Sequence, residues 1–130
     1  MRKSLKLALT LVAGLTLGTA SLNTAKAATW HKGTPKALRG SWIYHRKQVS
    51  QFGQITFTAS KYQRQDQGMP QTKGKHLKYR YVGHGTYKIH AYIYGAKGTG
   101  YHNGWATMTI KKHNGRIQPK GDLWFHRGTL

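Results

Sequence analysis

TYKIHAYIY, residues 86–94, is the stretch that decides the fold, because apolar and polar side chains alternate along it. A period of two places one set in the core and the other in water, which is typical of a β-strand. The inward set is Tyr87, Ile89, Ala91 and Ile93. The outward set is Lys88, His90, Tyr92 and Tyr94.

The same alternation recurs in short segments over most of the chain. It is found in residues 42–45, 54–60, 76–82 and 105–112, with a last strand or two over 116–117 and 122–126. No apolar stripe with helical spacing follows residue 27. Asn114-Gly115 predicts a type I′ hairpin turn, whereas the Gln-rich residues 61–75 predict a long loop. We therefore expect one all-β domain over residues 40–130, a small antiparallel barrel or sandwich of five to seven strands.

The first 27 residues have the pattern of a cleaved signal peptide. Three early cations precede an apolar run over residues 7–22, and Ala25-Lys26-Ala27 is a small-x-small cleavage motif. Residues 28–39 then form a polar lead-in, expected to be a loop or a single turn. No later segment is apolar enough to span a membrane, so we expect a secreted protein.

The charge balance is extreme, with 22 Lys and Arg against two acids, Asp66 and Asp122. Loss of the leader and its four cations leaves a net charge of +16, which protonation of eight histidines raises further in acid. Such a field attracts polyanions. Outside a cell, the expected partner is an anionic envelope polymer such as teichoic acid or an acidic polysaccharide, with extracellular nucleic acid as a second possibility.

The candidate binding face combines cations with rings that stack on sugars or bases. Its predicted residues are Lys88, His90, Tyr92, Tyr94, Trp105, Lys111, Trp124 and His126. The alternative is that these side chains form a second packed face or line a barrel.

Most catalytic classes are disfavoured by what the chain lacks. It has no cysteine, no glutamate and no Gly-x-Ser-x-Gly elbow, and its histidines do not have metal-ligand spacing. We therefore expect no enzyme activity, no metal and no cofactor.

WHKGTPKALRGSW, residues 30–42, resembles the segment W-x-K-G-T-P-K-x-L-R-G-x-W that follows the signal peptide in small secreted proteins of lactobacilli and related lactic acid bacteria. The resemblance covers 13 residues. It implies an extracellular location and assigns no activity.

Gly40-Ser41-Trp42 also resembles the G-x-W entry to lipocalin-like barrels. That resemblance implies that Trp42 closes the base of a reduced barrel against Arg127, with Gly40 allowing close approach of the backbone. It also supplies the alternative function, a carrier of a small apolar ligand in a cavity. The expected cavity lining is Leu77, Tyr79, Tyr81, Ile89 and Ile93. The sequence gives no prediction of oligomeric state.

Overall fold

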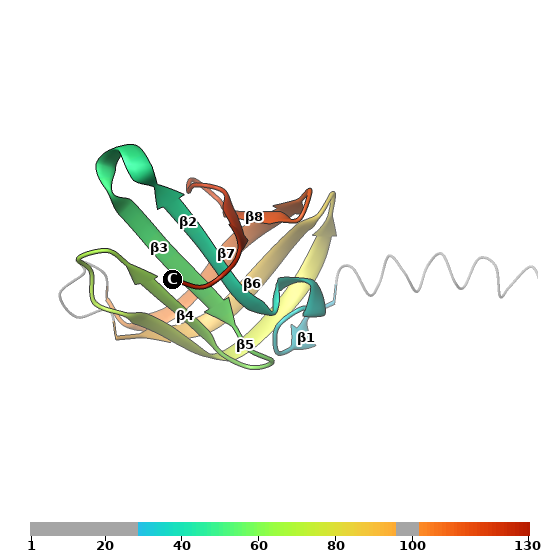
Figure 1. The fold of residues 1–130 in the computed structure, drawn as a ribbon. Coiled ribbons are helices and arrows are strands. Elements are labelled where there is room, and N and C mark those ends of the chain that lie inside the picture. Colours follow the sequence, from blue (N-terminus) through green and yellow to red (C-terminus); the bar gives the residue numbers. More distant parts are fainter. Residues whose placement is uncertain (1–28, 96–101) are drawn as a thin grey trace, which may run out of the picture.

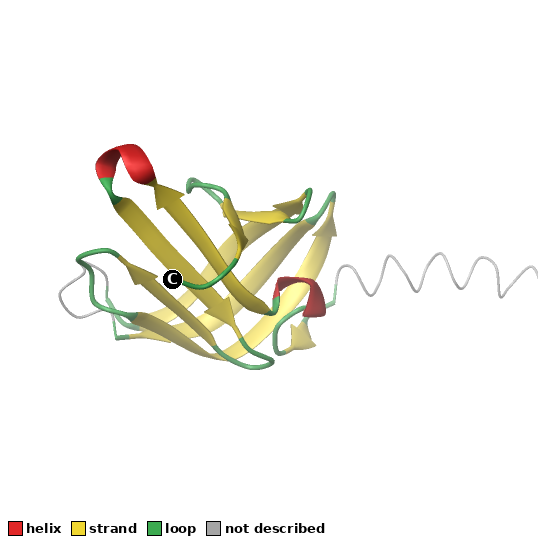
Figure 2. Cartoon of the chain, in the orientation of Figure 1, coloured by secondary structure: helices red, strands yellow, loops and turns green. Residues whose placement is uncertain are grey.

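Nine strands and two short 3₁₀ turns make up the computed structural model, which describes residues 29–95 and 102–130 (Figures 1 and 2). The predicted signal peptide lies outside the described residues. The strands are β1 (His31–Lys32), β2 (Gly40–Arg46), β3 (Gln51–Phe57), β4 (Tyr62–Asp66), β5 (Thr72–Gly83), β6 (Thr86–Tyr94), β7 (Gly104–His113), β8 (Arg116–Pro119) and β9 (Phe125–Arg127). The turns are η1 (Lys36–Leu38) and η2 (Lys47–Val49).

The sheet closes on itself. Its order is β1-β5-β4-β3-β2-β9-β8-β7-β6, and an additional pairing of β5 with β6 joins the ends. All pairings are antiparallel. Eight strands therefore form a closed barrel, and β1 adds one strand beside β5. The all-β expectation is confirmed, but five to seven strands was an underestimate, and closure excludes the sandwich.

The barrel interior is filled by the inward set of each strand. Ile55 and Phe57 from β3, Ile89 and Ala91 from β6, and Ile110 from β7 are buried in one apolar cluster. These positions lie two apart along their strands, as the alternation predicted. Burial of this face, rather than hydrogen bonding alone, fixes the strand register.

The predicted long loop over residues 61–75 is wrong. This segment holds β4 and the first residues of β5, which pair with each other through Tyr62↔Gly74 and Arg64↔Thr72. The inward positions here include Arg64, Thr72 and Gly74, none of which has an apolar side chain. The alternation of apolar and polar residues is therefore lost. Polar inward side chains hid β4 and the start of β5 from the sequence pattern.

The lead-in is more ordered than a simple loop. Its residues form β1, which pairs His31 with Tyr79 of β5, and η1, which ends at the buried Leu38. Figure 1 shows β1 and η1 at one end of the barrel, opposite η2. The lead-in thus covers that end, which we call the base.

Trp42 seals the base. Its ring is fully buried, and its Nε1 donates a hydrogen bond of 2.8 Å to the carbonyl of Leu38. The Arg127 guanidinium lies 3.8 Å from the centre of the Trp42 ring and donates to the carbonyls of Arg39 and Ala37. Gly40 has a φ of +113°, which favours glycine, and a Cβ there would stand 2.5 Å from Arg127 Nη1.

The turn between β7 and β8 has the geometry that its residues favour. Asn114 and Gly115 have φ angles of 51° and 73°, and they connect the paired residues His113 and Arg116. Positive φ at both central positions of a two-residue loop defines a type I′ turn.

Candidate functional site

The outer sides of β5, β6 and β7 form one continuous surface, which we call the cationic face. The register aligns Lys75 with Tyr92 and Tyr92 with Trp105. The adjoining rows are Lys73–Tyr94, Lys78–His90–Thr107, Arg80–Lys88–Thr109 and Thr86–Lys111. Directly opposed residues share a face, so six Lys and Arg side chains project from this surface.

Aromatic rings lie between the cations of this face. His90 stacks on Trp105 with ring centres 5.2 Å apart and planes 5° from parallel. Lys75 Nζ lies 5.6 Å from the Tyr92 ring centre and 5.1 Å from that of Tyr94. The two ring contacts hold the Lys75 ammonium close to the sheet.

Trp30 extends the cationic face across the start of β1. Lys78 Nζ and the Arg80 guanidinium lie 5.6 Å and 5.2 Å from its ring centre, and the His90 ring lies 6.2 Å away. Trp105 remains 59% exposed, so its ring is accessible to a partner. Acidic residues are absent from the face, because the chain's two acids both lie elsewhere.

Six of the eight predicted binding residues meet on this face, namely Lys88, His90, Tyr92, Tyr94, Trp105 and Lys111. Trp124 and His126 do not adjoin the β6–β7 pair. Trp124 comes just before β9 and His126 lies within it, and β8 separates β9 from β7. Sequence reasoning missed the contribution of β5, because residues 61–75 were predicted to be a loop and no strand order that would set β5 beside β6 could be read from the sequence.

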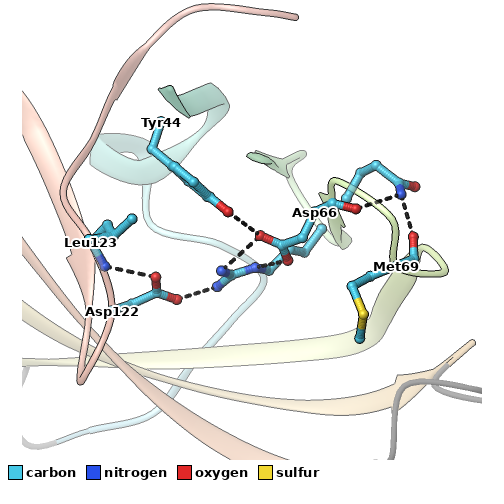
Figure 3. Close-up of polar contacts among 7 residues, drawn as sticks. Tyr44, Asp66, Met69, Asp122 and Leu123 are labelled. Carbon is cyan, nitrogen blue, oxygen red and sulfur yellow. Dashed lines mark hydrogen bonds and ion pairs between the residues drawn. The ribbon is translucent and has the colours of Figure 1, made fainter. Parts of the chain in front are cut away.

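A second site lies at the end of the barrel opposite the base, which we call the mouth. Asp66 and Asp122 both bind Arg64 there (Figure 3). Arg64 Nε lies 2.7 Å from Asp66 Oδ2, and Arg64 Nη1 lies 2.6 Å from Asp122 Oδ2. Tyr44 Oη donates to Asp66 Oδ1 over 3.1 Å. All the negative side-chain charge of the protein is thus gathered on one guanidinium.

The ion pair between Arg64 and Asp122 crosses the mouth. Arg64 belongs to β4, whereas Asp122 lies in the turn that follows β8. In the sheet order these strands are four steps apart, which is the opposite side of an eight-stranded barrel. Phe125 lies on one side of the guanidinium, with its ring centre 5.4 Å away. We call this contact the transverse ion pair.

Burial and charge set the protonation of this cluster. Burial alone lowers the pKa of Arg64, but the hydrogen bonds and charges of Asp66 and Asp122 outweigh it and raise that pKa. Burial raises the pKa of Tyr62 to about 12, and burial with the Asp66 hydrogen bond raises the pKa of Tyr44. Both phenols are therefore neutral and the guanidinium is charged at neutral pH.

Two adjoining cavities occupy the mouth. The outer one, the vestibule, has a volume of about 860 Å³ and includes Tyr44, Arg46, Met69 and Leu123 in its lining. The inner pocket has a volume of about 280 Å³. Its apolar lining is Ile55, Ile93, Met108, Ile110 and Pro119. The two cavities share Tyr62, Arg64, Thr72 and Asp122.

The cavity lining expected from the sequence is mostly wrong. Only Ile93 of the five predicted residues lines the inner pocket. Leu77 and Ile89 are instead packed in the solid core, and Tyr81 is exposed. The sequence did contain a signal for the polar cluster at the mouth, namely Arg64-x-Asp66. Residues two apart on a strand share a face, so these two side chains lie together.

The described residues bring no three His, Asp, Glu or Cys side chains close enough to hold a metal ion. Within the same part of the chain, no helix is long and apolar enough to cross a membrane. Comparisons of the chain with protein-family models, curated proteins and solved structures return no match. Function must therefore be argued from the two sites themselves.

Proposed function

We propose that this protein is a secreted, non-enzymatic β-barrel that associates through its cationic face with an anionic polymer of the bacterial envelope, such as teichoic acid or an acidic polysaccharide. The observation that supports this most directly is the set of six Lys and Arg side chains aligned on β5, β6 and β7 without a neighbouring carboxylate. Electrostatic attraction of this kind speeds encounter and weakens with salt.

The spacing of the cations suits a linear partner. Residues two apart on a strand are separated by roughly 6–7 Å, and neighbouring strands by about 4.8 Å. One extended chain lying across the face therefore meets several cations at once. The exposed Trp105 ring adds a flat surface for sugar or base units.

Retention of the purified protein on immobilised teichoic acid tests the proposal. We expect binding at low salt and release at about 0.5 M NaCl, because that ionic strength screens exposed charges. Binding should strengthen from pH 7 to pH 5, since histidine side chains as a class gain positive charge in this range and the chain has eight of them. A neutral dextran matrix is the control. Failure to bind at low salt contradicts the proposal.

Export itself has a separate test. We propose cleavage after Ala27, which would give a mature chain that begins at Ala28. N-terminal sequencing of the protein from culture medium checks the cleavage site. Recovery of the whole protein inside the cell contradicts it.

A second candidate function, a lipocalin-like carrier of a small ligand, is supported by the cavities at the mouth. A barrel closed at its base and hollowed at its mouth is a common form of ligand-binding site. A bound ligand raises the melting temperature by mass action. Absence of a shift with neutral, anionic and cationic aromatic ligands alike contradicts this second function.

A further inference from the structure

The transverse ion pair lies on the boundary between the vestibule and the inner pocket, because both cavities include Arg64 and Asp122 in their lining. A molecule that passes from one cavity to the other meets this contact. The other two shared residues, Tyr62 and Thr72, come from β4 and β5 on the Arg64 side of the barrel.

The charged groups at this boundary already have partners within the protein. Asp66 Oδ1 accepts from Tyr44 Oη and Arg64 Nη2, and Oδ2 accepts from Arg64 Nε. Asp122 Oδ2 accepts from Arg64 Nη1, and Oδ1 accepts a 2.7 Å hydrogen bond from the backbone N–H of Leu123 (Figure 3). All four carboxylate oxygens are thus satisfied.

A charged ligand would gain little below this boundary. Its charge would lose water and meet either an apolar lining or groups that are already paired, so no new contact would offset the cost of desolvation. Lys120 also lines the inner pocket, but it is exposed, and its long side chain can hold the ammonium in water. An uncharged ligand avoids this cost.

The size of the inner pocket restricts the ligand further. An apolar protein cavity of about 150 Å³ accepts benzene, so a pocket of about 280 Å³ corresponds to a molecule of roughly ten to twelve non-hydrogen atoms. Ile55 and Ile110, which belong to the core cluster, are among its lining residues, so the pocket borders the barrel core. A bicyclic aromatic or a compact terpene-like molecule has the right size and polarity.

We propose that the inner pocket binds a small uncharged apolar molecule of bicyclic size, and that the transverse ion pair selects against charged ligands at its entrance. This inference rests on the second of the two proposed functions and is independent of the cationic face. Arg64 and Asp122 are specificity-determining residues in this proposal, whereas Asp66 positions Arg64.

Three ligands of nearly equal size test the proposal on the intact secreted protein: 1-naphthalenemethanol (neutral), 1-naphthoate (anionic) and 1-naphthylmethylammonium (cationic). Titration calorimetry should show that the neutral compound binds at least tenfold more tightly than either ion. If none of the three binds, both the inference and the carrier function fail. If an ion binds as tightly as the alcohol, the inference fails while the carrier function stands.

Two aspartate variants separate the transverse ion pair from the local one. Asp122→Asn weakens the contact across the mouth, and we expect naphthoate to gain at least fivefold in affinity as Arg64 is partly released. Asp66→Asn is the matched control, because it makes the same charge change beside the same guanidinium but leaves the Arg64–Asp122 contact in place. An equal gain in naphthoate affinity in both variants would overturn the selective role of the transverse ion pair.

Pocket-filling variants locate the binding site. Met108→Phe adds volume within the inner pocket and should reduce binding of the alcohol by at least tenfold, and Ile93→Phe should do the same from the neighbouring strand. Circular dichroism and a cooperative thermal transition establish which variants are folded. Unchanged binding in a folded pocket-filling variant would place the ligand elsewhere and overturn the proposal.

Discussion

Removal of the Arg127 guanidinium tests how the base of the barrel is closed. In Arg127→Ala the protein loses a cation–π contact with the buried Trp42 ring and the hydrogen bonds to the carbonyls of Arg39 and Ala37. The stacking contributes about 1 kcal/mol. Hydrogen bonds from a charged donor at this exposed site add about 1 kcal/mol more. We expect the free energy of unfolding to fall by about 2 kcal/mol, the sum of these two contributions.

Urea denaturation followed by tryptophan fluorescence measures this loss. Trp42 is the fully buried tryptophan, whereas Trp30, Trp105 and Trp124 are at least 36% exposed, so the emission shift on unfolding reports mainly on the base. For a domain of this size, 2 kcal/mol corresponds to a fall of about 10 °C in melting temperature.

Two further variants make the result specific. Arg127→Lys keeps the charge but not the planar group, and it should recover less than half of the loss. Arg116→Ala removes an exposed arginine at the β7–β8 turn and should change stability by less than about 0.5 kcal/mol. If Arg127→Ala is as stable as Arg116→Ala, the account of the closed base is wrong.

Three other predictions concern the backbone and the buried phenol. Gly40→Ala should cost about 2 kcal/mol in urea denaturation, because φ is +113° and the added methyl group meets Arg127; an unchanged midpoint would contradict this. Gly115→Ala should cost about 1 kcal/mol in the same assay, since the type I′ turn requires positive φ there, and a stabilised variant would refute the turn assignment. Because the pKa of Tyr62 rises from 10.0 to about 12 on folding, the unfolded state loses its proton first, so stability should fall between pH 10 and pH 12 by about 2–3 kcal/mol. Tyr62→Phe should lose less stability over that window when midpoints at pH 9 and pH 11.5 are compared, and an equal loss would rule out the Tyr62 contribution.

Alternation of side chains was sufficient to predict the strands whose inward positions are apolar. Ile55 and Phe57 in β3, and Ile89 and Ala91 in β6, show the pattern clearly and are buried as expected. The pattern failed in β4, where the inward Arg64 is satisfied by two carboxylates instead of by apolar contacts. Partly buried ion pairs on the inner side of a strand interrupt hydrophobic periodicity, so strands that contain them are missed.

The sites depended on information that local patterns do not carry. Arg64 and Asp122 are 58 residues apart, and only barrel closure brings them together across the mouth. The cationic face needed the register of β5 against β6, which a β-bulge shifts between Lys75 and Lys78. The sequence did provide one usable signal, Arg64-x-Asp66, because residues two apart on a strand share a face.

The central claim is that the position of the cations on the cationic face, and not only the net charge of the protein, directs binding to a polyanion. A variant with Lys73, Lys75, Lys78 and Lys88 all replaced by Gln tests it against a control of equal net charge. The control replaces four exposed cations outside the face, Lys36, Arg46, Lys47 and Arg116, by Gln.

The measurement is the salt dependence of affinity for purified teichoic acid, from about 0.05 to 0.5 M NaCl. By analogy with single-stranded nucleic acid, each cation–phosphate contact contributes about 0.7 to the slope of log K against log salt. We predict that replacement of the four lysines lowers the magnitude of this slope by roughly three and weakens binding at least tenfold at low salt. The control should keep most of the slope. Equal slopes and affinities for the two variants would show that net charge alone governs binding, and would contradict the account.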